Sequence, residues 1–186
     1  IRLSDQFFAA LSEISGHGMP EVLDDERNRL IDSYVDAHKY VSGKRAAIYG
    51  EPDLVVALAA FLSEIGIRPI ICGTGAKVKK WDEVLAAEIE GGIEDVIALS
   101  GTDHAKISER ARELKPDLIL GSSKGYPLAR ELGIPLVRIG FPIHDRIGAQ
   151  RMCSVGYRGT QELFDRIVNV LLEVKQEHSD TGYSYQ

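Results

Sequence analysis

Residues 44–53 read Lys-Arg-Ala-Ala-Ile-Tyr-Gly-Glu-Pro-Asp, a short and mostly apolar run that passes through a glycine turn into the start of a helix. The apolar run has the length of a strand. Gly50 permits a tight turn, and Pro52 followed by Asp53 suits the first turn of a helix. A continuous apolar run, in place of an alternating one, is typical of a parallel strand in a sheet that is covered on both faces.

Short apolar strands alternate with helices along the rest of the chain, which is the pattern of β-α-β units. Strands are expected at residues 44–49, 67–72, 95–99, 117–120 and 135–139. Helices are expected at residues 4–15, 20–41, 52–65, 78–90, 102–114, 126–132 and 160–176, the first between Ser4 as N-cap and Gly16 as stop. The pattern predicts an α/β fold: a Rossmann-like, doubly wound parallel sheet of about five strands, preceded by two helices.

Three regions follow from this pattern. We expect residues 1–42 to be a helical lead-in, residues 43–159 to be the Rossmann-like parallel α/β domain, and residues 160–186 to be a C-terminal helix and tail. The chain enters a helix pattern at Ile1 without an initiator Met, so we interpret it as a segment of a longer protein. The polar tail at 179–186 is expected to be ordered only against a neighbour.

Composition restricts the functional class. The 186 residues are 44% apolar and 27% charged, which is typical of one globular domain. The net charge of −6 argues against a general nucleic-acid or anionic-membrane binder, and no apolar run approaches the ~20 residues that span a bilayer. With only Cys72, read as a buried thiol, and Cys153, we expect a reducing cytoplasm and no iron–sulfur site within the segment, because such a cluster usually takes about four cysteines.

Three loops would follow strands at the carboxyl edge of the sheet, where doubly wound folds bind ligands. They are residues 50–53, 73–75 and 121–125, and their glycines could present backbone N–H groups to an anion. None is a complete fingerprint: Val78 stands where the dinucleotide motif needs its third glycine, and no phosphate loop is present. The structural reading, that these glycines only form tight turns, is favoured, and we expect no nucleotide site.

Two aspartates offer the one metal pattern in the chain. Asp32 and Asp36 are four residues apart on a helix and therefore share a face. Two adjacent carboxylates can hold a hard divalent cation, although like charges at this spacing disfavour an isolated helix. The alternative is a solvated polar face with Arg29 and Lys39 nearby.

The segment from 140 to 159 is a loop of roughly 20 residues, long for a compact domain and often functional at that length. It carries His144, Asp145 and Arg146 among apolar residues. Asp145 and Arg146 could pair locally or face a partner. We favour a packing or interface role for this loop over catalysis.

Several motifs resemble the β subunits of nitrogenase component 1, in order and over nearly the whole chain. They are Glu-Arg-Asn-Arg-Leu-Ile-Asp at 26–32, Asp-Ala-His at 36–38, Gly-Lys at 43–44, the run at 47–54, Ile-Pro-Leu-Val-Arg-Ile-Gly-Phe-Pro at 134–142 and Gly-Tyr-Arg-Gly at 156–159. The resemblance implies a chain with about three Rossmann-like domains in αβ pairs that assemble into an α2β2 complex. This segment would then be a C-terminal structural and interface domain that performs no chemistry alone.

The resemblance also implies partners and cofactors. The partners are an α-type scaffold subunit, a second β-type subunit and the nitrogenase iron protein. The segment itself would hold no cofactor, whereas the full complex would hold an iron–sulfur cluster and an iron–molybdenum cofactor precursor. The pair matching Asp32 and Asp36 contributes, in catalytic members, to a metal site between two β subunits.

One loop separates the branches of the family. Catalytic β subunits carry a His-rich run after the FP-x-x-DR motif, whereas residues 147–151 here read Ile-Gly-Ala-Gln-Arg. This favours the scaffold subunit of iron–molybdenum cofactor biosynthesis. Two alternatives stay open: the same domain of a catalytic molybdenum–iron protein β subunit or a related component 1-type reductase, and an independent Rossmann-like small-molecule-binding module.

Overall fold

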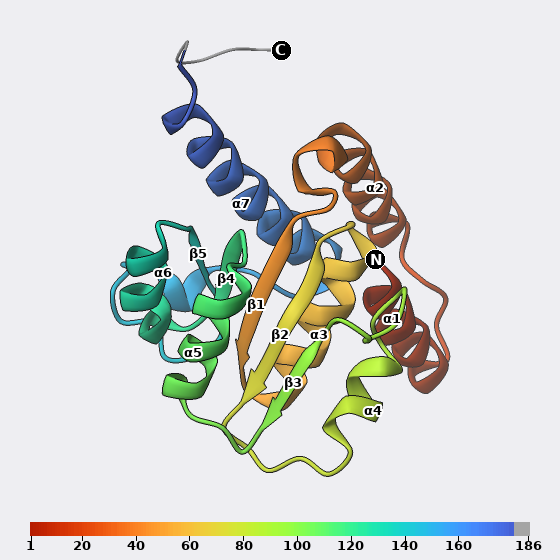
Figure 1. Ribbon diagram of the computed structural model, residues 1–186. Coiled ribbons are helices and arrows are strands. Elements are labelled where there is room, and N and C mark those ends of the chain that lie inside the picture. Colours follow the sequence, from red (N-terminus) through yellow and green to blue (C-terminus); the bar gives the residue numbers. More distant parts are fainter. Residues whose placement is uncertain (181–186) are drawn as a thin grey trace.

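A five-stranded, all-parallel sheet with the order β3-β2-β1-β4-β5 forms the centre of the molecule (Figure 1). The structure is a computed structural model that describes residues 1–180. Its strands are β1 (Arg45–Gly50), β2 (Arg68–Thr74), β3 (Ile97–Ser100), β4 (Leu118–Gly121) and β5 (Leu136–Arg138). The predicted parallel α/β fold is confirmed. The end of the predicted polar tail, residues 181–186, lies outside the described part.

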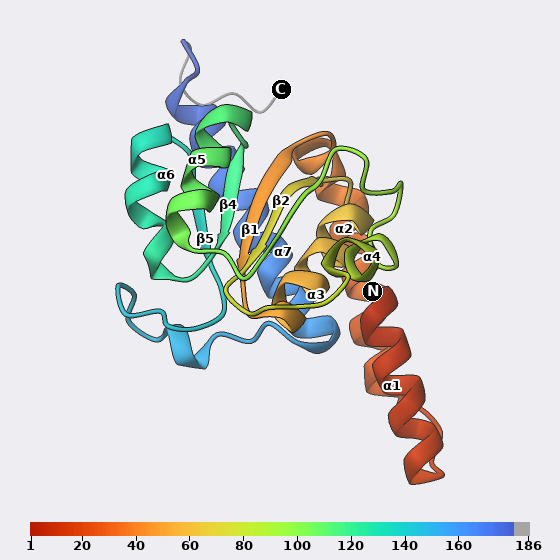
Figure 2. The same ribbon diagram turned by 60° about the horizontal axis from the view of Figure 1, so that its bottom comes forward.

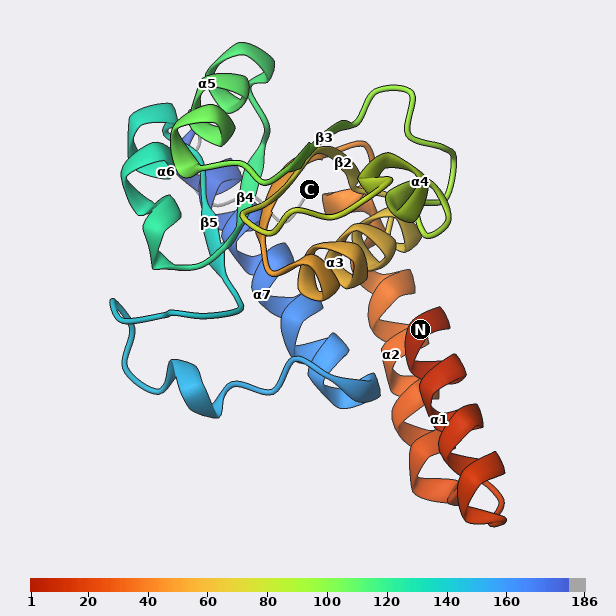
Figure 3. The same ribbon diagram turned by 90° about the horizontal axis from the view of Figure 1, so that it is seen from below.

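Seven helices accompany the sheet in the described residues. They are α1 (Arg2–Ser15), α2 (Glu21–Val41), α3 (Pro52–Glu64), α4 (Trp81–Ala86), α5 (His104–Leu114), α6 (Tyr126–Leu132) and α7 (Gly156–Glu177), with short 3-10 turns at Ser123–Gly125 and Ala149–Arg151. The two helices that precede the sheet are as predicted. In Figure 3, α5 and α6 lie on one side of the sheet, and α3 and α7 lie on the other.

Alternate residues of β1 build the two halves of the core. Ala46 and Ile48 pack with α3 and α7, whereas Ala47 and Tyr49 pack with α5 and α6. All four side chains are buried. Because both faces of the strand are covered, the apolar run at 44–49 is continuous and not alternating. Successive strands are added in one direction from β1 to β3 and in the other from β4 to β5, so the topological switch point lies between β1 and β4. In doubly wound folds, ligands bind at the carboxyl edge of this point.

Helices α1 and α2 form an antiparallel hairpin that projects beyond the sheet (Figures 2 and 3). Asp5 of α1 accepts hydrogen bonds from Nε and Nη2 of Arg27 in α2, both at 2.9 Å, and from the Tyr157 hydroxyl in α7 at 2.7 Å. The Arg27 hydrogen bond lowers the pKa of Asp5, so the carboxylate stays ionised. Tyr34 of α2 packs on Phe164 of α7 at 4.9 Å between ring centroids. The hairpin is therefore fixed to the domain at its base.

Three helix predictions are wrong at their ends. The predicted helix 78–90 is shorter in the structure, where α4 starts after Lys80, whose φ of 53° is left-handed, and ends at Ala86. Helix α7 begins about one turn earlier than predicted, at Gly156 instead of 160. Ser4 lies inside α1 and is not its N-cap, although Gly16 does end that helix in the left-handed conformation.

Candidate functional site

On the face of the sheet that α5 and α6 cover, the carboxyl edge between β1 and β4, the expected ligand crevice of this topology, is filled by a side chain. Tyr49 is 4% exposed, and its hydroxyl donates a hydrogen bond to the Ser122 carbonyl oxygen. A Cβ atom at Gly121 or at Gly125 would collide with the Tyr49 ring or hydroxyl. These glycines therefore make room for an aromatic ring, which supports the structural interpretation of the 121–125 loop over an anion-binding one.

His104 of α5 is half-buried against this ring. The two ring centroids lie 4.5 Å apart in an edge-on arrangement. Burial lowers the pKa of His104, and the charge of Lys124 lowers it further. The imidazole is therefore neutral at pH 7 and packs against the Tyr49 ring that fills the crevice. His38 of α2 is exposed.

The loop after β5 is held to the carboxyl edge by Asp145. Nε of Arg138 lies 2.9 Å from Oδ1 of Asp145, and Nη2 lies 2.6 Å from Oδ2. The Ser123 hydroxyl donates to the same carboxylate and accepts from the His144 backbone N–H at 3.0 Å. These hydrogen bonds, first from Arg138 and then from Ser123, hold the pKa of Asp145 far below its usual range.

The ionised Asp145 carboxylate thus holds the loop to the carboxyl edge of the sheet. The predicted local contact with Arg146 exists, at 3.7 Å, but it is secondary. The sequence did not reveal the main partner, because Arg138 and Ser123 approach Asp145 only once β4 pairs with β5.

The fastened loop exposes large apolar side chains. Phe141 is 86% exposed, Ile147 is fully exposed and Val155 is 78% exposed. Helix α1 adds Phe7, Leu11 and Ile14, whose spacing puts them on one helix face, all exposed. An apolar cavity of about 540 Å³ lies between α1, α3 and the start of α7. Apolar residues gathered on anchored elements are typical of protein–protein contact surfaces.

Asp32 and Asp36 lie exposed on α2, together with Arg29, as the helical period predicts. Within residues 1–180 neither carboxylate has a hydrogen bond or an ion pair, whereas Leu30 on the opposite face is buried. Two oxygen donors one turn apart supply part of the six or more that a hard cation takes. The described part of the chain brings no three His, Cys, Asp or Glu side chains together as a metal site.

The two cysteines lie in different surroundings. Cys72 is buried in β2, as predicted, and burial raises the pKa of its thiol to about 12. Cys153 is half-buried in the loop, 3.6 Å from the Val155 carbonyl oxygen. Neither belongs to a three-ligand cluster in residues 1–180. Over the same range, no helix combines the length and apolarity that crossing a membrane would require.

Comparison with known proteins places these features in a family. Residues 1–172 match the family described as Nitrogenase component 1 type Oxidoreductase. The chain is 36% identical to the nitrogenase molybdenum-iron protein beta chain of Methanococcus maripaludis over 181 residues, covering 97% of this chain and 39% of that one. It is 37% identical to the beta chain of the same name from Azotobacter vinelandii, covering 95% of this chain and 35% of that one.

Comparison with solved structures also finds nitrogenase chains. The whole chain superposes on a chain of the structure "Nitrogenase Cp1 at pH 6.5" with a TM-score of 0.91 and 32% identity, covering 41% of that chain. A second structure, "Nitrogenase Cp1 at pH 5", matches with a TM-score of 0.59 and 16% identity, which shows the shared fold alone. This chain therefore spans between 35% and 41% of the length of these relatives.

Proposed function

The chain belongs to the nitrogenase component 1 type oxidoreductases, and from this we propose that it is the C-terminal structural and interface domain of a β-type subunit in an α2β2 complex. Two observations together carry the proposal: a side chain fills the expected ligand crevice, and two surface regions expose large apolar side chains. Tyr49 fills the crevice, whereas the 141–155 loop and the outer face of α1 offer apolar side chains to a partner.

The α2 face with Asp32 and Asp36 is proposed to meet a second β-type subunit. Like charges one turn apart disfavour the helix slightly, and in the described residues neither carboxylate forms an ion pair. A divalent cation held jointly with the opposite subunit would compensate both carboxylates. The two aspartates would supply oxygen ligands, and the partner subunit would complete the coordination.

The chemistry of the complex would lie outside this segment. An iron–sulfur cluster and the iron–molybdenum cofactor precursor would be bound by the rest of the complex, which would receive electrons from the nitrogenase iron protein in the cytoplasm. Cys72 cannot contribute readily, because its thiol is buried and its pKa is raised.

Within the family, we favour the scaffold branch of iron–molybdenum cofactor biosynthesis, with an α-type scaffold subunit as partner. The support is the segment 147–151, which carries no histidine and exposes Ile147 and Arg151. The second candidate is the same domain of a catalytic molybdenum–iron protein β subunit, and the names of the relatives favour it.

Anaerobic co-expression of the complete β-type polypeptide with its α-type partner tests the proposal. The scaffold role predicts an iron-containing α2β2 complex that transfers a cofactor precursor to cofactor-deficient component 1 and reduces no substrate itself. Substrate reduction with the iron protein would assign the catalytic role instead. A β-type polypeptide that binds no α-type partner would refute the interface role altogether.

A further inference from the structure

The projecting half of the α1–α2 hairpin exposes an apolar surface (Figures 2 and 3). We call residues 6–26, which lie beyond the ion pair of Asp5 with Arg27, the hairpin tip. Both helices and the turn between them contribute large exposed apolar side chains to it: Phe7, Leu11, Ile14, Met19 and Val22. No residue of α1 is buried in the described part of the chain. The tip therefore offers a docking surface and not a part of the core.

Three of these side chains form a stripe along α1. Phe7, Leu11 and Ile14 are four and three residues apart, so they share one face of the helix. The base of the same helix is fixed to the domain, because Nη2 of Arg2 lies 2.9 Å from the carboxylate of Glu88. A stripe with this spacing on an anchored helix is the surface against which a second helix packs.

The charge of the tip decides which partner suits the stripe. Residues 6–26 contain five carboxylates and no lysine or arginine, in a protein whose net charge is −6. They belong to Glu13, Glu21, Asp24, Asp25 and Glu26. Within residues 1–180 none of the five forms an ion pair, whereas Asp5 and Arg27 at the base compensate each other. The apolar stripe is thus accompanied by charge of one sign.

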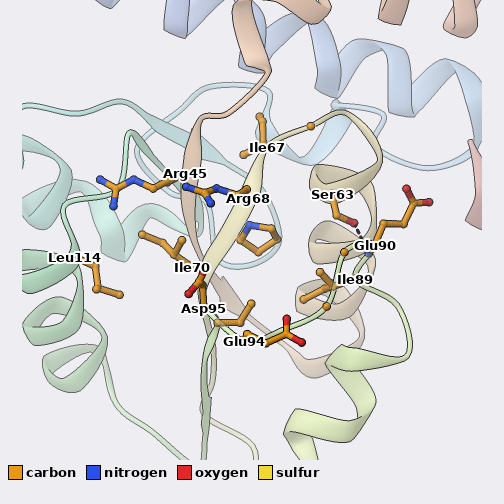
Figure 4. A pocket seen from close by; sticks show the side chains of 15 residues that line it. Arg45, Ser63, Ile67, Arg68, Ile70, Ile89, Glu90, Glu94, Asp95 and Leu114 are labelled. Carbon is orange, nitrogen blue, oxygen red and sulfur yellow. Dashed lines mark hydrogen bonds between the residues drawn. The ribbon is translucent and has the colours of Figure 1, made fainter.

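The tip differs in this respect from the cleft of about 440 Å³ at the amino edge of the sheet (Figure 4). Arg45 and Arg68 line that cleft together with Glu90, Glu94 and Asp95. Its mixed charges favour neither an anion nor a cation. The tip offers only carboxylates, so a cationic partner is favoured there.

Two other occupants are disfavoured by the same charge. A second copy of the chain, docked tip to tip, would bring two sets of uncompensated carboxylates together. A membrane that carries anionic lipid would also repel the tip. We infer that the hairpin tip docks a basic amphipathic helix of a partner protein, with its apolar face on the stripe of α1 and its lysines or arginines among the carboxylates. The inference names the chemistry of one partner and rests on the interface role proposed for α1.

Fluorescence anisotropy of a labelled amphipathic peptide of leucine and lysine, titrated with the 186-residue chain, tests the tip. Saturable binding with a Kd of about 10 μM or tighter is expected. It should weaken at least about fivefold when NaCl is raised from about 0.05 M to about 0.5 M. The same peptide with glutamate in place of lysine should bind at least about tenfold more weakly.

Matched variants separate the tip from the rest of the surface. Ile14→Ser should weaken binding at least about fivefold, whereas Ile147→Ser, which removes an exposed isoleucine from the 141–155 loop, should leave it unchanged.

The charge variant Glu21→Gln/Asp25→Asn should weaken binding at least about threefold. Its control, Glu173→Gln/Glu177→Gln, removes two exposed carboxylates at the same spacing on α7 and should have no effect. Thermal melts establish that the variants are folded. If the charge variant is not, because Glu21 lies in the first turn of α2, Glu13→Gln replaces it and should still weaken binding.

Four results would overturn the inference. They are no saturable binding to the unaltered chain, equal binding of the glutamate peptide, equal losses in a tip variant and its control, and sedimentation of the chain with phosphatidylcholine vesicles that Ile14→Ser abolishes. The third would indicate general charge attraction, and the fourth would make the tip a lipid anchor. Assembly with the α-type partner tests the interface role separately, so peptide binding can fail while that role stands.

Discussion

Replacing Gly121 with Ala tests whether Tyr49 closes the crevice between β1 and β4. The added methyl group would meet a buried ring that has no space to retreat into, because His104 lies behind it. Overpacking of this kind costs about 1–3 kcal/mol. If the ring shifts, its hydroxyl also loses the Ser122 carbonyl, and a buried polar group left unpaired costs about 1–3 kcal/mol. We expect Gly121→Ala to lower the free energy of unfolding by about 3 kcal/mol.

Urea titration followed by the fluorescence of the single, buried Trp81 measures this change. For a chain of this size, 3 kcal/mol corresponds to a fall in Tm of roughly 6–12 °C. Gly18→Ala is the control, since nothing lies within 4 Å of that position and its backbone suits any residue. It should be neutral or slightly stabilising.

A double-mutant cycle isolates the contact. In a Tyr49→Ala background the methyl group has room, so Gly121→Ala should then cost less than about 1 kcal/mol. An unchanged midpoint for Gly121→Ala alone, or an equal cost in both backgrounds, would show that the ring does not fill the crevice and would reopen it as a ligand site.

Three further predictions follow from the same structure. Calorimetry should show no ATP or NAD binding tighter than about millimolar, roughly −4 kcal/mol, because Tyr49 occupies the crevice. A micromolar Kd would instead favour the alternative that the chain is an independent Rossmann-like small-molecule-binding module. Asp145→Asn should lower the Tm at pH 7. The folded pKa of Asp145 lies below its ordinary value of 3.8, so the stabilisation by its carboxylate is complete above that pH and is lost as the pH falls towards the folded pKa. The difference in Tm between variant and parent should therefore narrow in acid melts. A difference in Tm that does not change with pH would contradict the ion pair between Asp145 and Arg138. Anaerobic reconstitution of the chain with iron and sulfide should leave it colourless, and a stoichiometric cluster signal would overturn the view that the cluster ligands lie elsewhere.

The fold class was predictable because its signal is local. The continuous apolar runs and the glycine turns after them are properties of neighbouring residues, and so is the helical period that puts Asp32 and Asp36 on the face opposite Leu30. These predictions needed no knowledge of which strands pair.

The features that were missed depend on long-range packing. The glycines at 121 and 125 were correctly favoured as tight turns, but only strand pairing shows that they make room for the Tyr49 ring. The Arg138–Asp145 pair likewise forms only when β5 completes the sheet. The short α4 depends on Trp81, whose indole donates to the Cys72 carbonyl oxygen at 3.1 Å and fixes where the helix can begin. Tertiary contacts of this kind override local helix propensity.

The interface role is tested most directly by analytical ultracentrifugation of the complete β-type polypeptide bound to its α-type partner. The comparison is between the unaltered complex, the variant Asp32→Asn/Asp36→Asn, and the control Glu173→Gln/Glu177→Gln, which removes two exposed carboxylates at the same spacing on α7. The stability of the 186-residue chain should change by no more than about 0.5 kcal/mol in either variant, because all four side chains are exposed.

We predict that the unaltered complex and the control sediment as α2β2, whereas the aspartate variant sediments largely as αβ pairs. An aspartate variant that still forms the full tetramer would contradict the assignment of this α2 face to the contact between β-type subunits.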